Sequence, residues 1–230
     1  MPPEVIHSAS FVEDAVSIIL ASARQAIAER GIFRVSLSGG RTPAPIYSRW
    51  AASAGDLPWD RVQITFGDER CVPPDDEQSN YLMARRTLLD TVPIPEGNVF
   101  RIRGEIAPAD AAAEYDARLA QVASRFGEPR YQHDLLLLGM GPDGHTASLF
   151  PGTEALAEQT RNVVSNFVPK LNAWRVTFTY PLLNAARHVC FLLEGPDKKP
   201  IVDQILAGQG NYPSEGVKPT DGQLTWLLGT

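Results

Sequence analysis

Short runs of apolar residues recur along the chain, and stretches with helical spacing of apolar residues lie between them. Short apolar runs predict strands, whereas apolar residues three and four positions apart predict amphipathic helices. The runs that predict strands are 32–37, 61–66, 98–102, 134–138, 162–167, 176–180 and 188–193. The spacing predicts helices over 10–27, 43–52, 79–89, 109–126 and 200–206, followed by a tail rich in Gly and Pro. Ser10 and Glu13 form a capping-box pattern at the first helix, and Ser79 suits an N-cap.

Strands that alternate with helices indicate an α/β fold with a mostly parallel, Rossmann-like sheet and helices on both faces. The closely spaced strands after residue 162 indicate additional antiparallel pairing. Neither a linker nor an internal repeat interrupts the pattern, so we expect residues 1–230 to form a single domain. In such sheets ligands bind at the carboxyl ends of the strands, and the residues that follow each strand therefore carry the functional prediction.

Composition narrows the class of protein. With 43% hydrophobic and 21% charged residues, the chain resembles ordinary globular proteins, and its net charge of −6 argues against broad nucleic-acid binding. The chain contains neither an apolar run long enough for a membrane span nor the pattern of a signal peptide, so we expect a cytoplasmic protein. Cys71 and Cys190 are too few for a disulfide framework, and no ligand spacing indicates a metal site.

A glycine-containing turn follows the predicted strand 32–37. Ser38, Gly39 and Gly40 precede Thr42, which suits a helix N-cap, and Pro43, which suits the first helical position. Two glycines let the backbone approach a ligand closely, and a helix N-terminus offers free N–H groups to a phosphate. The alternative interpretation is a plain strand-to-helix turn.

Charged residues follow other predicted strands. Asp68 and Arg70 come directly after the strand 61–66, in a position to hold a substrate hydroxyl and an anion. Arg175 precedes an alternating apolar segment, and Lys198 follows the strand 188–193. Singly, each cation is an ordinary surface residue, but three cations beside a helix N-terminus suit a phosphate monoester.

Four consecutive leucines, 135–138, precede a loop with three glycines, Asp143 and His145. The loop formally matches the dinucleotide pattern GxGxxG, but Asp143 would repel a pyrophosphate. A glycine loop that exposes a histidine is the better interpretation, since imidazole can accept a proton from water near neutral pH. Asp143 could fix the tautomer of His145. The other histidines, His7, His133 and His188, have no such context and are interpreted as structural.

Four segments together resemble the 6-phosphogluconolactonases of the glucosamine-6-phosphate isomerase/6-phosphogluconolactonase superfamily. They are SLSGGRTP, FGDERCVPPDDEQSNY, LLLLGMGPDGHTASLFPG and RVTFTYPLLNAARHVCFLLEGPDKK, and they span residues 36–199. The resemblance implies hydrolysis of 6-phospho-D-glucono-1,5-lactone, without metal or organic cofactor and with a sugar phosphate as the small-molecule partner. It implies that His145 is the general base and that Asp143 orients it. It further implies a phosphate site made by Ser38, Gly39, Gly40, Thr42, Arg70, Arg175 and Lys198, with Asp68 facing the sugar hydroxyls.

Two alternatives remain. The sister branch, glucosamine-6-phosphate deaminase/isomerase, typically continues the histidine loop as HIAFNEP, in which the Glu partners the histidine. Phe150 occupies that position here, which disfavours the isomerase. A sugar-phosphate sensor without catalysis is the second alternative, although the chain shows no basic helix-turn-helix segment. The pattern leaves open the oligomeric state, with a monomer plausible, the donor to the oxyanion, and whether the loop 72–78 closes over substrate.

Overall fold

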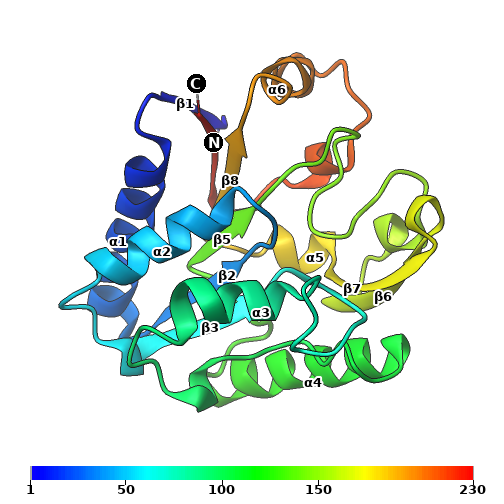
Figure 1. Ribbon diagram of the computed structural model, residues 1–230. Helices are drawn as coiled ribbons and strands as arrows, with labels where there is room; N and C mark the ends of the chain where they lie inside the picture. Colours follow the sequence, from blue (N-terminus) through cyan, green and yellow to red (C-terminus); the bar gives the residue numbers. More distant parts are fainter. Residues whose placement is uncertain (1, 230) are drawn as a thin grey trace.

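A parallel β-sheet forms the centre of the molecule in the computed structural model, which describes residues 2–229 (Figure 1). Within those residues the sheet has six strands in the order β1-β9-β8-β5-β2-β3, and every neighbouring pair is parallel. The strands are β1 (Glu4–Ser8), β2 (Phe33–Leu37), β3 (Val62–Phe66), β5 (Leu135–Leu138), β8 (His188–Glu194) and β9 (Gln223–Gly229). The predicted α/β fold with a mostly parallel sheet flanked by helices is thus confirmed.

The helices cover the sheet from both sides. They are α1 (Phe11–Arg30), α2 (Pro43–Ser53), α3 (Asn80–Ala84), α4 (Pro108–Arg125), α5 (Tyr180–Leu183) and α6 (Lys199–Leu206). Figure 1 shows α1 and α2 on one face and α5 on the other. α3 runs directly into a π-helical turn, Arg85–Leu89, that packs against α2.

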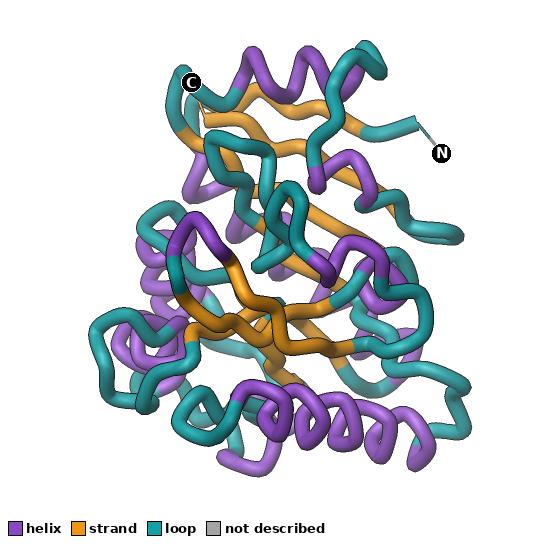
Figure 2. Tube along the Cα trace, turned by 90° about the vertical axis from the view of Figure 1, so that its right-hand side faces the viewer, coloured by secondary structure: helices purple, strands orange, loops and turns teal. Residues whose placement is uncertain are grey.

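A second, antiparallel sheet lies on the same side as α5. Its strands are β4 (Asp68–Arg70), β7 (Ala173–Phe178) and β6 (Val163–Val168), in the order β4-β7-β6. Figure 2 looks onto this side and shows the small sheet in front of the central strands, with α4 along its edge. The antiparallel pairing expected after residue 162 is confirmed, and it also takes in β4, which directly follows β3.

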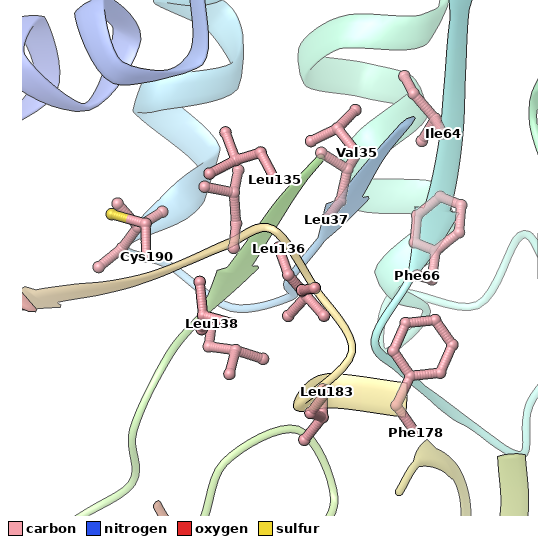
Figure 3. Close-up of a cluster of buried hydrophobic side chains, with 14 of the residues drawn as sticks. Val35, Leu37, Ile64, Phe66, Leu135, Leu136, Leu138, Phe178, Leu183 and Cys190 are labelled. Carbon is pink, nitrogen blue, oxygen red and sulfur yellow. The ribbon is translucent and has the colours of Figure 1, made fainter. Parts of the chain in front are cut away.

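Apolar side chains from neighbouring central strands pack together in the interior (Figure 3). All side chains of β2, β3 and β5 are buried, because helices cover one face of the central sheet and α5 with the small sheet covers the other. Figure 3 shows Leu135 and Leu136 of β5 pointing to opposite faces of the sheet. Leu183 of α5 and Phe178 of β7 lie on the face to which Leu136 points. The apolar runs at β2, β3 and β5 are therefore strands buried on both faces.

The strand order reverses at β2, because β3 is added on one side of it and β5 on the other. The chain passes from β2 to β3 on one side and then returns to place β5 on the other side of β2. Loops that leave two such strands at their carboxyl ends turn away from each other and open a crevice, where ligands bind in open α/β sheets. Here those loops are 38–42 and 139–150.

Two sequence-based predictions of elements are wrong, and one strand was missed. Residues 98–102 form no strand: Val99 makes one isolated bridge to Ile64, and the Phe100 carbonyl accepts from Tyr115 Oη (2.8 Å) instead of from a neighbouring strand. The predicted C-terminal tail contains β9, a buried strand between β1 and β8. No strand was predicted for β1, whose pairing with β9 links opposite ends of the sequence.

The first helix begins as predicted, but without the predicted capping box. Ser10 occupies the N-cap and its side chain makes no cap hydrogen bond. Its backbone N–H instead donates to Ser8 Oγ (3.0 Å), which in turn donates to Asp14 (2.5 Å). Ser79 does cap α3, because its Oγ accepts from the Leu82 N–H at 3.2 Å.

Candidate active site

A cavity of about 510 Å³ lies at the carboxyl ends of β2, β5 and β8. Its lining contains His145 and every residue predicted to bind substrate: Ser38, Gly39, Gly40, Thr42, Asp68, Arg70, Arg175 and Lys198. Asp143 is not part of the lining and instead bonds to His145 from behind. Residues spread over most of the chain are thus brought to one place.

The loop after β2 exposes backbone to the cavity. Gly40 has a φ of +105°, in the region that favours glycine. A Cβ on Gly39 would lie 1.8 Å from Oδ1 of Asn80, so glycine is needed where these two segments meet. Thr42 takes the N-cap position of α2 but makes no side-chain cap bond. Its hydroxyl is therefore not used by the helix, which suits the predicted contact with a phosphate.

Tyr47, buried in α2, fixes the start of this loop. Its hydroxyl accepts from the Ser38 N–H and donates to the Ser38 carbonyl, both at 2.9 Å. The backbone of Ser38 is thus held in one orientation before any ligand arrives. A fixed start of the loop reduces the entropic cost of placing the following residues around an anion.

Two arginines lie side by side on neighbouring strands of the small sheet. Arg70 of β4 and Arg175 of β7 are directly paired in the antiparallel register, and both line the cavity. Burial and the nearby Arg70 guanidinium hold the pKa of Arg175 below its ordinary value. Like charges in directly opposed positions destabilise a sheet, so the pair suits a bound anion that would relieve the repulsion.

The carboxylate of Asp68 is oriented by two neighbours. Asn80 Nδ2 donates to Oδ1 (3.1 Å) and Ser148 Oγ donates to Oδ2 (2.7 Å). Each oxygen retains a free lone pair, and Asp68 lines the cavity. An ionised carboxylate held in this way can accept hydrogen bonds from sugar hydroxyls.

Glu69, the neighbour of Asp68, has a structural part. Its buried carboxylate accepts from the backbone N–H groups of Arg70 (2.8 Å), Asn80 (2.8 Å) and Tyr81 (2.9 Å), and from Ser79 Oγ (3.0 Å). Burial raises the pKa of Glu69 and these backbone donors oppose the rise. The side chain ties β4 to the start of α3 and so sets the position of Asn80.

The loop after β5 presents His145 at the cavity and Asp143 beside it. Asp143 Oδ1 lies 2.5 Å from His145 Nδ1, and the side chain of His145 is 25% exposed. A Cβ on Gly141 would lie 2.1 Å from the imidazole ring, and Gly144 has a φ of +71°. Glycine is therefore required at both positions for the loop to fold back around the ring.

Phe150 and Lys170 complete the surroundings of this pair. The rings of His145 and Phe150 stack with centroids 3.9 Å apart and an interplanar angle of 19°. Lys170 Nζ forms an ion pair with Asp143 Oδ2. Burial acts to raise the pKa of Asp143, but hydrogen bonds from Lys170 and His145 outweigh it and hold that pKa well below its usual range. Asp143 is accordingly an ionised carboxylate that only accepts.

Sequence reasoning missed several residues of the site: Arg41, Tyr47, Asn80, Ser148 and Lys170. Arg41 lies inside the predicted phosphate loop, so its position was a usable signal. Asn80 and Lys170 lie far in sequence from the groups they contact, and no local pattern marks them. In contrast, His133 is fully buried, and His188 is half-buried with Nε2 2.9 Å from Thr225 Oγ1, in keeping with their structural interpretation.

Within residues 2–229, no group of three or more His, Cys, Asp or Glu side chains converges in a way that could hold a metal ion. In the same part of the chain, no helix has both the length and the apolar character of a membrane span.

The chain is similar to known proteins along nearly all its length. It is 41% identical over 223 residues to a 6-phosphogluconolactonase of a Nostoc species, covering 95% of this chain and 91% of the relative. A Synechocystis relative with the same name is 40% identical and covers 99% and 96%. The crystal structure of 6-phosphogluconolactonase from Thermotoga maritima matches with a TM-score of 0.87 at 29% identity, covering 99% of this chain and all of that one. The enzyme from Trypanosoma cruzi matches with a TM-score of 0.87 at 30% identity, covering 99% and 94%. Residues 7–226 match the family described as glucosamine-6-phosphate isomerases/6-phosphogluconolactonase, and the chain belongs to that family.

Proposed function

We propose that this protein hydrolyses 6-phospho-D-glucono-1,5-lactone to 6-phosphogluconate and that His145 is the base that activates water. The sequence-based assignment to the 6-phosphogluconolactonases agrees with the relatives of 41% and 40% identity that carry this name. The observation that carries the proposed mechanism is the Asp143–His145 pair, joined at 2.5 Å, whose histidine lines a cavity together with Arg70 and Arg175.

The tautomer of His145 follows from its partner. An ionised Asp143 can only accept, so Nδ1 of His145 carries the proton that it donates, and Nε2 is left with a lone pair. Nε2 would take a proton from water as its oxygen attacks C1 of the lactone. When the ring C1–O5 bond breaks, the imidazolium returns that proton to O5. The new carboxyl group then loses its own proton to solvent.

Substrate binding in this proposal divides between the cations and the carboxylate of the cavity lining. Arg70, Arg175 and Lys198 would neutralise the phosphate next to the loop 38–42, while Asp68 would accept from ring hydroxyls. A lactone is an activated ester, so a positioned water and a base suffice without a covalent nucleophile. The stack of Phe150 on His145 supports this assignment over the isomerase, since Phe150 occupies the position of the Glu typical of that branch.

A two-substrate assay tests the proposed function. The protein should accelerate acid release from freshly prepared 6-phosphogluconolactone above the spontaneous rate, and it should release no ammonia from glucosamine 6-phosphate. The reverse pattern would assign the chain to the isomerase branch. Acceleration of neither reaction, with the sugar phosphate still bound, would favour a sensor.

Replacing the base tests the mechanism. His145→Ala should lower kcat by roughly 10²–10⁴-fold, the usual contribution of a general base. The matched control is His7→Ala, since His7 is exposed in β1 and is not part of the cavity lining. Undiminished activity in the His145 variant would exclude the proposed base.

A further inference from the structure

The β6–β7 hairpin delivers a lysine to the proposed catalytic pair. Lys170 lies in the 3₁₀ turn Pro169–Leu171 that joins the two strands, and it lines the cavity together with Leu171. Its ammonium group pairs with Asp143 Oδ2 and lies 5.8 Å from the ring centroid of Phe150. Lysine, aspartate, histidine and phenylalanine therefore form one cluster from separate parts of the chain.

The two carboxylate oxygens of Asp143 have different partners. Oδ1 accepts from His145 Nδ1 at 2.5 Å and is 3.4 Å from the His145 backbone nitrogen, while Oδ2 accepts from Lys170. Within residues 2–229, only Lys170 and His145 make hydrogen bonds to this carboxylate. A carboxylate bonded at one oxygen can rotate about its bond to Cβ, whereas bonds at both oxygens fix its plane. Lys170 is thus the group that fixes Asp143 from the side opposite His145.

The hairpin that carries Lys170 is itself held against the loop of His145. Pairing continues to Val168↔Ala173 at the end of the hairpin, and Asn172 closes the turn in the left-handed region at φ +47°. On β6, Asn166 Nδ2 donates to the Ser148 carbonyl at 2.8 Å. Because Ser148 lies in the segment between His145 and Phe150, this bond ties the hairpin to the loop that carries the base.

We propose that Lys170 is a positioning residue for the water-activating histidine. It holds the carboxylate of Asp143 in one plane, so that Nδ1–H of His145 has a fixed acceptor and Nε2 points at the substrate. The inference rests on the proposed function of His145 and extends it to a residue on another element. Lys170 does this from the turn of the β6–β7 hairpin, whereas Asp143 and His145 both lie in the loop after β5.

Kinetics of Lys170→Met and Lys170→Arg provide the first test. Met keeps the alkyl chain and removes the charge, so kcat should fall by roughly 10–100-fold, the cost of a misplaced catalytic group, with KM changed less than about threefold. Arg keeps a cation that can pair with Asp143 and should restore most of kcat. Lys199→Met is the matched control, since Lys199 is similarly exposed and also pairs with a carboxylate, Asp203.

The second test reads the imidazole directly and needs no activity. In ¹⁵N NMR spectra of the neutral ring, the unchanged protein should show His145 with a protonated Nδ1 and an unprotonated Nε2. Lys170→Met should show a mixture of the two tautomers, and Lys170→Arg should show the original one. A purely structural effect on the hairpin would lower stability without altering the tautomer.

Several outcomes would overturn the inference while leaving the proposed function intact. One is an active parent and inactive His145→Ala variant, with Lys170→Met retaining both kcat and the single tautomer. Another is a large rise in KM at unchanged kcat, which would make Lys170 a substrate contact. If Lys170→Met fails to fold, Lys170→Gln replaces it in both tests. An active His145→Ala variant would instead refute the proposed base, and the NMR measurement would still judge whether Lys170 positions His145.

Discussion

The ring of Phe150 gives His145 a flat apolar surface on which to rest. Face-to-face packing at 3.9 Å restricts the tilt of the imidazole, and the contact adds no charge next to it. Asp143 is then the only carboxylate that hydrogen-bonds to His145 within residues 2–229. A single acid, a stacked ring and a lysine on the far side of the acid together determine how this histidine is oriented.

Asp143→Asn tests that arrangement at the scale of one residue. Asparagine can turn its NH₂ group toward Nδ1, which would then accept, and the proton would move to Nε2, where it blocks the base. We expect kcat to fall by roughly 10²–10⁴-fold with little change in KM. Initial rates with freshly prepared lactone measure both. Asp203→Asn changes an exposed residue of α6 that pairs with Lys199, and it should keep full activity; equal rates for the two variants would contradict the role of Asp143.

The sequence predicted the residues that follow strands and missed those that support them. Ser38, Asp68 and His145 each lie in the segment that follows an apolar run, so strand pattern and the rule for parallel sheets sufficed to place them. Asn80 and Lys170 act through contacts with residues 12 and 27 positions away, respectively, and such pairings depend on tertiary structure. No local spacing of residues in the sequence predicts these two contacts.

At the scale of elements, β1 and β9 show the same limit. Each is a short run whose pairing partner lies at the other end of the chain, so neither could be paired from local pattern. The strand β4 illustrates the opposite case. The sequence predicts its three residues, Asp68–Arg70, only as charged residues that follow a strand, but pairing with β7 makes them a strand and aligns Arg70 with Arg175.

The alignment of Arg70 with Arg175 predicts that removing one charge stabilises the ligand-free protein and weakens its binding of a phosphate. Arg175→Gln removes the like charge and keeps most of the side chain, so the ligand-free protein should be as stable or more stable, by up to about 1 kcal/mol. The same change removes one phosphate contact, and affinity for 6-phosphogluconate should fall roughly tenfold or more, as for a charge-assisted hydrogen bond. Thermal denaturation and calorimetric titration measure the two effects.

The control for this prediction is Arg161→Gln, because Arg161 is exposed and pairs with Glu158 away from the cavity. It should leave product affinity unchanged. If Arg175→Gln lost stability and kept its affinity, the arginine would be a packing residue of β7, and the anion site would have to lie elsewhere.

At the scale of the whole molecule, polar side chains are buried near the amino ends of β2 and β5 as well as at the candidate active site. Arg34 of β2 is 3% exposed, pairs with Glu128 at 2.5 Å and lies over the rings of Phe126 and Tyr131. His133, just before β5, is fully buried beside this group. The candidate site thus lies at the carboxyl ends of β2 and β5, and a buried polar cluster lies near their amino ends. The buried histidine of this cluster makes the stability of the protein depend on pH.

His133 should make the protein less stable as pH falls. Its Nε2 lies 2.8 Å from Thr65 Oγ1, and burial, with a smaller contribution from Arg34, lowers its pKa from 6.5 to about 3. Below pH 6.5 the unfolded chain therefore binds a proton that the folded protein does not bind until pH is near 3. Acidification over this range favours unfolding, by up to about 1.4 kcal/mol per pH unit from this residue.

Urea denaturation at pH 7, 6 and 5 measures this dependence. His133→Gln should be less stable than the parent at pH 7, since the ring packs against Tyr131 and Phe178. Its free energy of unfolding should nevertheless decline less steeply with falling pH, by roughly 1 kcal/mol per unit between pH 6 and 5. Comparing slopes isolates His133, because buried carboxyls with raised pKa, such as Glu69, are the same in both proteins and act in the opposite direction. Equal slopes would mean that His133 takes up its proton inside the folded protein, with the bond to Thr65 rearranged to accommodate the charge.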